Sequence, residues 1–264
     1  MARQRLGQHF LGNNGWRKRI LDNLRVAANE TWIEIGPGHG EMTKLLAGDG
    51  RKIVAIEADQ ALAEGLRANV DSYPSEWSGV AVVTSDVLQA DIGKLVDGPF
   101  RVYGSLPYFI TSPILQHLFR WADRIASIHI VIQLEVAERI AAEPGRRDYG
   151  YLSTLCQFYT KPKIAFHIPP GAFRPPPKVQ SALVEMKLPG EASRLQIVNP
   201  PEFFDFLQAC FAQKRKTLRN NLLGKWTDTE IQEALCDTDI RRDARAEQLT
   251  LDQFAQIFRR ILVR

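Results

Sequence analysis

The sequence predicts an α/β fold in which a mostly parallel sheet with an antiparallel edge strand is followed by a small all-α domain. Three observations lead to this prediction: short continuous apolar runs, amphipathic segments between them, and a change of pattern after Tyr151. Continuous apolar strands that alternate with helices are typical of a parallel sheet covered on both faces. With 264 residues, 45% of them hydrophobic, the chain is long enough to bury a full core.

The first part of the chain supplies the parallel strands and the helices between them. A strand is expected where a short apolar run ends at glycine or polar residues, and a helix where apolar residues recur every three or four positions. The expected strands cover residues 31–35, 53–57, 80–84, 100–104 and 128–132. The expected helices cover residues 42–46, 60–70 and 135–142.

The pattern changes in the last part of the chain. The runs 161–166 and 181–187 are strand-like, and the proline-rich loop between them is no crossover helix, so we expect an antiparallel pair at one edge of the sheet. From residue 201 onward the sequence predicts helices alone, and we divide the chain into domains at 1–189 and 190–264. The expected helices of the second domain cover residues 203–212, 214–223, 228–235 and 251–262.

Composition excludes several classes of protein. The three cysteines, Cys156, Cys210 and Cys236, are odd in number and widely spaced, which indicates neither a metal-ligand pattern nor a disulfide framework. The chain begins without an apolar signal region and has no run that approaches the length of a membrane span. We therefore expect a cytoplasmic protein without a membrane partner. The formal net charge of +4 is too small to identify a partner by itself.

A glycine-rich loop follows the first expected strand. In Ile33-Glu34-Ile35-Gly36-Pro37-Gly38-His39-Gly40 the glycines allow a tight turn and let a ligand approach bare backbone, most closely at Gly36 and Gly38. A dinucleotide-binding loop has its third glycine three residues after the second, whereas here it comes after two. That spacing resembles the methyltransferase version of the fold, whose ligand is a nucleoside carrying a sulfonium amino acid. The plain structural interpretation is an ordinary turn between a strand and a helix.

Two carboxylates follow the next expected strands. Glu57 ends the second strand, where a carboxylate can accept hydrogen bonds from both hydroxyls of a ribose. Asp86 follows the third strand, where its side chain can meet an adenine amino group. Either residue alone would be interpreted as a loop carboxylate or a helix cap. Because open α/β sheets bind ligands at the carboxyl ends of their strands, three signals at successive strand ends favour a nucleoside site.

The fourth expected strand leads into Ser105-Leu106-Pro107-Tyr108, which resembles the motif of adenine-N6 methyltransferases. The N6 amine of adenine is a poor nucleophile because its lone pair is delocalised into the ring. Acceptors aimed at its N–H groups stabilise the positive charge that develops in the transition state, and the Ser105 hydroxyl and the carbonyl of Leu106 or Pro107 are candidates. Tyr108 offers a face on which an extruded base can stack. Taken alone, the segment could be a simple proline turn.

These segments together resemble the KsgA/RsmA family of small-subunit rRNA adenine dimethyltransferases, relatives of the Erm methyltransferases. The resemblance covers nearly the whole chain and implies a Rossmann-like class I methyltransferase sheet with a helical C-terminal domain. It is carried by the glycine loop, the reaction loop and three further segments: Gly7-Gln8-His9-Phe10-Leu11, Phe173-Arg174-Pro175-Pro176-Pro177-Lys178-Val179-Gln180-Ser181-Ala182 and Phe211-Ala212-Gln213-Lys214-Arg215-Lys216-Thr217-Leu218-Arg219-Asn220-Asn221-Leu222. The last two favour the KsgA branch over Erm.

The resemblance implies roles for single residues. Phe173 and Tyr108 would sandwich the target adenine, and S-adenosylmethionine would be the methyl donor, with no metal required. The implied substrate is a pair of adjacent adenosines near the 3′ end of small-subunit rRNA, each dimethylated within an assembling 30S subunit, by an enzyme that we expect to be a monomer. The cofactor-contacting positions implied by the family are His9, Leu11, Gly36, Glu57, Asp86 and Ser105.

Two residues depart from the family pattern. His9 stands where many members have Asn, and either side chain can form hydrogen bonds. Ser105 stands where the family usually has Asn. Serine can still accept through its hydroxyl, but it lacks the amide and is shorter by about 1.5 Å, roughly one bond. This departure bears on the rate, and most of all on the second methylation.

Basic residues cluster in two segments. Four of them, Lys214, Arg215, Lys216 and Arg219, fall within two turns of the expected helix, and such clusters are typical of phosphate binding. A solvated helical face is the plain structural interpretation. A further group lies near the N-terminus, where it comprises Arg3, Arg5, Arg17, Lys18, Arg19 and Arg25.

Three other functions compete with the main interpretation. One is methylation of large-subunit rRNA, as in Erm. A second is a ribosome-assembly factor that binds RNA and has lost most of its catalysis, which Ser105 would fit. The third is a nicotinamide-dependent dehydrogenase, which the glycine spacing disfavours.

Overall fold

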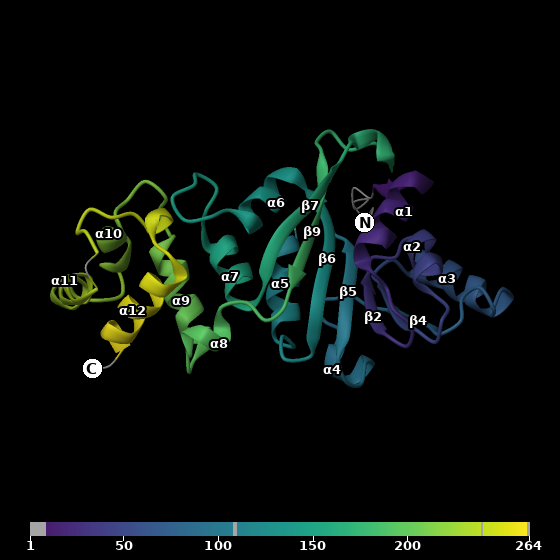
Figure 1. Cartoon of the computed structure of the whole chain (residues 1–264), viewed down its shortest axis with the longest axis horizontal. Helices are drawn as coiled ribbons and strands as arrows, with labels where there is room; N and C mark the ends of the chain where they lie inside the picture. The colour runs from purple at the N-terminus through teal and green to yellow at the C-terminus, as the bar shows by residue number, and fades with distance from the viewer. Residues whose placement is uncertain (1–8, 108–109, 239, 263–264) are drawn as a thin grey trace, which may run out of the picture. The chain divides into compact units, whose positions relative to one another are not determined.

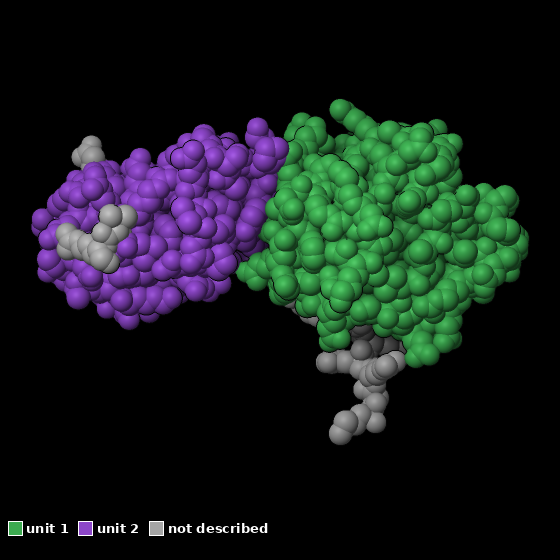
Figure 2. Space-filling model, turned by 90° about the horizontal axis from the view of Figure 1, so that it is seen from below, with its two compact units in different colours: residues 1–137, 163–188 green, residues 138–162, 189–264 purple. Residues whose placement is uncertain are grey.

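The computed structural model describes residues 9–107, 110–238 and 240–262, and the chain forms two compact units. Unit 1 comprises Met1–Ala137 and Lys163–Leu188, and unit 2 comprises Glu138–Pro162 and Pro189–Arg264, green and purple in Figure 2. The helical unit thus takes in residues 138–162 in addition to the expected segment 190–264. Among the described residues, no helix is both long enough and apolar enough to cross a bilayer.

Unit 1 is built on a seven-stranded sheet with the strand order β4-β3-β2-β5-β6-β9-β7 (Figure 1). The first five strands of this order run parallel, whereas β9 runs antiparallel to β6 and β7 forms the edge beside it. The prediction of a mostly parallel sheet with an antiparallel strand near one edge is therefore confirmed. The strands are β2 (Thr31–Ile35), β3 (Lys52–Glu57), β4 (Val80–Thr84), β5 (Phe100–Ser105), β6 (Ile125–Gln133), β7 (Lys161–Ile168) and β9 (Ser181–Lys187).

Helices connect these strands and cover the sheet. Asn13 caps the first helix by accepting from the Trp16 N–H, and Asp59 caps the third in the same way at Ala61 and Leu62. The first helix buries Ile20 and Leu24 in one cluster with Trp32 of β2. The helices are α1 (Asn14–Leu24), α2 (Glu41–Leu46), α3 (Gln60–Ser72), α4 (Ile92–Leu95), α5 (Thr111–Phe119) and α6 (Leu134–Ala141).

A second, very small sheet lies in unit 1. Strand β1 (Phe10–Leu11) pairs antiparallel with β8 (Phe173–Arg174), so that Phe10 faces Arg174 and Leu11 faces Phe173. The 3-10 turn η1 (Pro170–Ala172) leads into β8, and the Ala172 carbonyl accepts a hydrogen bond from the Gly12 N–H. This pairing joins the N-terminal segment of unit 1 to the segment that follows β7.

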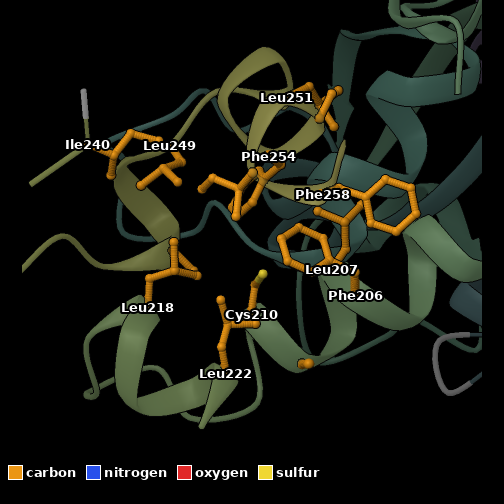
Figure 3. Close-up of a cluster of buried hydrophobic side chains, with 14 of the residues drawn as sticks. Phe206, Leu207, Cys210, Leu218, Leu222, Ile240, Leu249, Leu251, Phe254 and Phe258 are labelled. Carbon is orange, nitrogen blue, oxygen red and sulfur yellow. The ribbon is translucent and has the colours of Figure 1, made fainter. Parts of the chain in front are cut away.

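Unit 2 is helical and has its own apolar core, part of which Figure 3 shows. Phe206, Leu207 and Cys210 meet Phe254 and Phe258 there, and all five side chains are buried. The elements are α7 (Tyr151–Tyr159), α8 (Ala192–Leu195), α9 (Pro200–Cys210), α10 (Leu218–Leu222), α11 (Asp228–Asp237), the 3-10 turn η2 (Ala246–Gln248) and α12 (Leu251–Leu262).

The expected helix over residues 214–223 is wrong in its first turn. Helix α10 begins only at Leu218, because Thr217 is extended and its hydroxyl accepts from the Asn220 N–H as an N-cap. Lys214, Arg215 and Lys216 lie in the turn before it. The basic residues are therefore presented by a turn and not by a helical face.

Candidate active site

A cavity of about 300 Å³ opens where the carboxyl ends of the parallel strands meet in unit 1. The glycine loop after β2, Glu57 at the end of β3, Asp86 after β4 and Ser105 at the end of β5 all line it. Such an edge is where α/β sheets bind ligands. The predicted strand-end signals are thus brought together around one cavity.

The glycine loop has a backbone shape that side chains would disturb. Gly36, Gly38 and Gly40 have φ angles of 67°, 60° and 85°, a region that L-residues rarely adopt. A Cβ atom on Gly38 would lie 2.7 Å from the ring of Phe10. Phe10 also packs on His39, with the ring centroids 4.7 Å apart. The loop therefore needs glycine both for its turn and for the close approach of the N-terminal strand.

Glu57 and Asp86 differ in their surroundings. Glu57 is buried, and its two carboxylate oxygens each accept a 3.0 Å hydrogen bond, from the Gly38 and Asp59 N–H groups. These bonds fix the carboxylate while leaving further lone pairs for a ligand. Asp86 is exposed, and its Oδ1 accepts from the Leu88 N–H at 2.9 Å. Both residues can offer acceptors to a nucleoside in the cavity.

Glu34 is a buried carboxyl that the sequence interpretation gave no role of its own. Its Oε2 has no hydrogen-bond partner among the described residues, and it lines the cavity. Burial raises the pKa of Glu34 to about 7, and the nearby charges of Glu41 and Glu57 act in the same direction. Burial, together with the charge of Glu34, also raises the pKa of the neighbouring Tyr103 hydroxyl.

The charges around the cavity are of one sign. Its described lining includes the carboxyl groups of Glu34, Glu41, Glu57 and Asp86 but no lysine or arginine. A cluster of carboxyl groups favours a cationic ligand, as a sulfonium nucleoside with an ammonium group would be. In the described part of the chain, no group of three or more His, Cys, Asp or Glu residues could hold a metal ion.

The reaction loop lies beside the glycine loop. A Cβ atom on Gly104 would lie 3.0 Å from the Ile35 carbonyl, so the absence of a side chain lets β5 run close to β2. The Leu106 N–H donates to the Val131 carbonyl at 3.0 Å and ties the loop to β6. Ser105, Leu106 and Pro107 all line the cavity. Tyr108, the predicted stacking residue, lies outside the described residues.

The N-terminal strand and β8 complete the wall. His9, Leu11 and Phe173 line the same cavity, although more than 160 residues separate His9 from Phe173. His9 Nδ1 lies 2.7 Å from the Pro175 carbonyl, and Phe173 is buried. The structure therefore places Phe173 and the predicted cofactor-contacting residues, Ser105 among them, around the same cavity.

Sequence reasoning missed the apolar part of this wall. These residues come from strand ends and helix starts, and their types do not differ from those of ordinary core residues, so no local signal marks them. Glu41, Ser85 and Tyr103 are polar exceptions, but none of them belongs to a recognisable spacing. The lining residues that were missed are Phe10, Ile35, Pro37, Glu41, Met42, Ile56, Ala58, Ser85, Val87, Leu88, Tyr103, Ile110, Ile114 and Val131.

The predicted RNA-binding residues lie in unit 2. Lys214, Arg215 and Lys216 are exposed in the turn before α10, and we call them the basic turn. The Lys214 ammonium donates to the Arg147 carbonyl, which places the exposed Arg147 beside the turn. Arg219 is engaged differently, since its Nε donates to Asp228 Oδ1 at 2.6 Å.

Comparison with known proteins identifies the family. Residues 1–262 match the family model for ribosomal RNA adenine dimethylase. The chain belongs to the ribosomal RNA adenine dimethylase family. It is therefore an S-adenosylmethionine-dependent methyltransferase of the class that acts on adenine in ribosomal RNA, and the resemblance found in its motifs is confirmed.

Three similar proteins illustrate the match. The ribosomal RNA small subunit methyltransferase A of Acidobacterium capsulatum is 39% identical, over 97% of this chain and 89% of that protein. The crystal structure of a dimethyladenosine transferase from Plasmodium falciparum has a TM-score of 0.79 at 23% identity, covering 94% of this chain and 96% of the other. The 23S rRNA methyltransferase ErmE has a TM-score of 0.68 at 25% identity, covering 96% and 99%. The predicted class I methyltransferase fold is thereby confirmed.

Proposed function

We propose that this enzyme transfers methyl groups from S-adenosylmethionine to N6 of two adjacent adenosines near the 3′ end of small-subunit rRNA, two groups to each. The observation that carries the proposal is the single cavity shared by the glycine loop, Glu57, Asp86 and Ser105. A relative that is 39% identical carries the name of a small-subunit rRNA methyltransferase, which supports the choice of subunit.

The residues of the cavity fit the cofactor. S-adenosylmethionine supplies an electrophilic methyl group on a sulfonium centre. Glu57 would accept from the ribose hydroxyls and Asp86 from the adenine amino group, while Gly36 and Gly38 leave room for the nucleoside against bare backbone. His9 and Leu11 would close the site from the N-terminal strand. The unpartnered Glu34 Oε2 provides a further buried acceptor in the lining of the same cavity.

The reaction loop would act on the target base. The Ser105 hydroxyl and the carbonyl of Leu106 or Pro107 would accept hydrogen bonds from the N6–H groups, and this favours the more tetrahedral nitrogen as positive charge develops on it. Phe173, with Tyr108 on the other face, would hold the extruded adenine by stacking. The proton lost from N6 after methyl transfer needs no strong base, because the methylated nitrogen is cationic and acidic.

The basic turn would position the RNA. Lys214, Arg215 and Lys216 are exposed, and the adjoining Arg147 adds a further cation to the same surface. Cations of this kind neutralise phosphates without reading sequence, which suits a substrate recognised by its shape inside a 30S subunit. Arg219 belongs to the same predicted group, and its ion pair with Asp228 would have to open or be shared for it to contact phosphate.

Two alternatives remain to be separated from this proposal. ErmE shares the fold and acts, by its name, on 23S rRNA, but it is 25% identical, against 39% for the small-subunit relative. An assembly factor with little catalysis would bind the cofactor and the subunit but leave adenine unmethylated. The presence of Ser105 in place of Asn makes this second alternative the more important one.

One experiment tests the proposal directly. Unmethylated small and large subunits are incubated separately with the enzyme and S-adenosylmethionine labelled in its methyl group, and the rRNA is digested to nucleosides. The expected product is N6,N6-dimethyladenosine from the small subunit, at two adjacent positions. Label in large-subunit rRNA alone would contradict the proposal and favour methylation of the large subunit, as in Erm. Cofactor binding without label in either subunit would favour the assembly factor.

A further inference from the structure

The short strand β1 forms a wall of the cavity and depends on an anchor outside its own sheet. It pairs with β8 at two positions only, Phe10 with Arg174 and Leu11 with Phe173. A two-stranded ribbon of this size is not stable in water by itself. Other contacts must therefore hold Leu11 where it lines the cavity.

Arg17 of α1 supplies such contacts. Its Nε donates to the Leu11 carbonyl at 2.7 Å, and its Nη1 donates to Asn14 Oδ1 at 2.9 Å. Its Nη2 lies 3.4 Å from Oε1 of Glu41, the first residue of α2. The rigid fork of a guanidinium suits several simultaneous bonds of this kind. A single side chain thus joins β1, α1 and α2.

The ion pair between Arg17 and Glu41 is partly buried, and it should therefore contribute more to stability than a pair on the surface. The Arg17 side chain is 15% exposed and that of Glu41 is 36% exposed, so water and salt screen this pair less than a pair between two fully exposed side chains. Glu41 stands in the first turn of α2, where a carboxylate is favoured by the helix dipole, and Gly40 gives this helix no side-chain cap. The sequence interpretation had placed Arg17 in a basic cluster; the structure turns it inward.

Two of the three partners of Arg17, Leu11 and Glu41, line the cavity, although Arg17 itself does not. Leu11 also faces Phe173 across the small sheet, and the Gly12 N–H donates to the Ala172 carbonyl at 2.9 Å. A shift of Leu11 would therefore change the cofactor wall and carry Phe173 with it. Through its bonds to the Leu11 carbonyl and to Glu41, Arg17 connects the N-terminal strand to the first turn of α2.

We propose that Arg17 is a positioning residue that sets the affinity of the cavity for S-adenosylmethionine by holding β1 against α2. This inference rests on the proposed function only in naming the cofactor. Arg17 does not line the cavity, and it acts through Leu11 and Glu41, which do.

The test compares Arg17→Met with Arg19→Met by calorimetric titration with S-adenosylmethionine. Arg19 is the matched control, because it lies on the same helix but places its guanidinium over the rings of Trp16 and Phe166, 5.1 and 4.4 Å from their centroids. Loss of hydrogen bonds from a charged, largely buried group predicts that Arg17→Met weakens binding about tenfold. Arg19→Met should stay within about twofold of the wild type, since each such cation–π contact is worth little at an exposed site.

A second variant and a second readout keep the test decisive. Arg17→Lys retains the charge but not the fork, so its affinity should lie between those of the wild type and Arg17→Met. Hydrogen exchange at the Leu11 and Gly12 amides should be faster in Arg17→Met than in Arg19→Met. Steady-state methylation should show a raised KM for the cofactor with kcat at saturation within about threefold of the wild type, because Arg17 contacts no reacting atom.

The results that would overturn this inference differ from those that would overturn the proposed function. Equal cofactor affinity of the wild type and both methionine variants would remove Arg17 from its positioning role. The same holds if Arg17→Met loses affinity only in proportion to the fraction of unfolded protein seen by circular dichroism. If the wild type binds the cofactor and Arg17→Met binds it weakly, the inference stands even where no rRNA is methylated.

Discussion

The cavity of unit 1 and the basic turn of unit 2 differ in burial and in the sign of their charge. In the cavity, Glu34, Glu57 and Phe173 are at most 5% exposed, and the charged lining is acidic. In the basic turn, Lys214, Arg215 and Lys216 are exposed and cationic. A buried group acts through its exact hydrogen bonds and its desolvation, whereas an exposed charge acts through a long-range field that salt screens.

Because of this difference, the two regions should respond differently to substitution. The cavity should be sensitive to changes that keep size but remove one acceptor, because its groups are held in place by the strands and loops around them. The basic turn should tolerate any change that keeps its charge.

The largest effect is expected at Ser105. Ser105→Ala removes the side-chain acceptor proposed for the N6–H groups, and loss of one such group lowers the rate by about 100-fold or more. Ser105→Asn restores the residue that the family usually has, and it should keep or raise activity. The measurement is single-turnover methylation of unmethylated small subunits. Equal methyl incorporation by the wild type and Ser105→Ala would remove Ser105 from the mechanism.

An effect of similar size is expected from the titration of Glu34. Burial raises the pKa of this carboxyl from 4.5 to about 7, so between these values the folded protein keeps a proton that the unfolded chain has lost. Stability therefore falls as pH rises from about 4.5 to about 7, by about 3 kcal/mol, and the loss stays constant above that pH. Glu34→Gln abolishes this titration.

Urea unfolding at several pH values checks the Glu34 prediction. The wild type should become less stable relative to Glu34→Gln as pH rises from 4.5 to 8, and the cofactor, as a cation, should bind more tightly once the carboxylate forms. Asp86→Asn is the control for the loss of a carboxylate that is exposed and not buried. A pH-independent difference between the wild type and Glu34→Gln would show that Glu34 titrates normally.

At the basic turn we expect charge alone to matter. Lys214→Glu, Arg215→Glu and Lys216→Glu together should weaken RNA binding by about tenfold or more and reduce its salt dependence, because phosphate contacts release counterions. The charge-conserving set Lys214→Arg, Arg215→Lys and Lys216→Arg should bind RNA like the wild type. Filter binding over a range of salt concentrations measures both, and cofactor affinity should be unchanged. RNA affinity that stays the same in the reversed variant at all salt concentrations would refute the assignment.

The sequence could predict those parts of the molecule whose signals are local. The run Thr31-Trp32-Ile33-Glu34-Ile35 predicted β2 to the residue, and the glycine loop that follows it pointed to the cavity edge. Such signals work because apolar periodicity, glycine turns and strand-end carboxylates are read from neighbouring residues. The division at residues 189 and 190 remains a sequence-based prediction. The compact units differ from it, because residues 138–162 belong to the helical unit.

The remainder depended on contacts between distant segments. No local sequence signal indicates that Phe10 and Leu11 pair with residues 173 and 174. A strand of two residues is also too short to show a strand pattern. One error was local: the apolar periodicity of residues 214–223 favoured a helix, but the Thr217 cap makes α10 begin at Leu218. The pairing of Arg219 with Asp228 follows from the tertiary fold, because the first residue of α11 lies beside the second residue of α10.

The smallest effect is expected at Arg147, which tests whether the surface around the basic turn extends beyond it. Its carbonyl holds the Lys214 ammonium, while its own side chain is exposed. Arg147→Ala should weaken RNA binding by about threefold, as the loss of one phosphate contact would, and lower the salt slope by less than one. Arg147→Lys should bind like the wild type, because the backbone carbonyl and the charge both remain. If Arg147→Ala leaves RNA affinity unchanged at low salt, the footprint ends at the turn and Arg147 serves only to anchor Lys214 through its backbone.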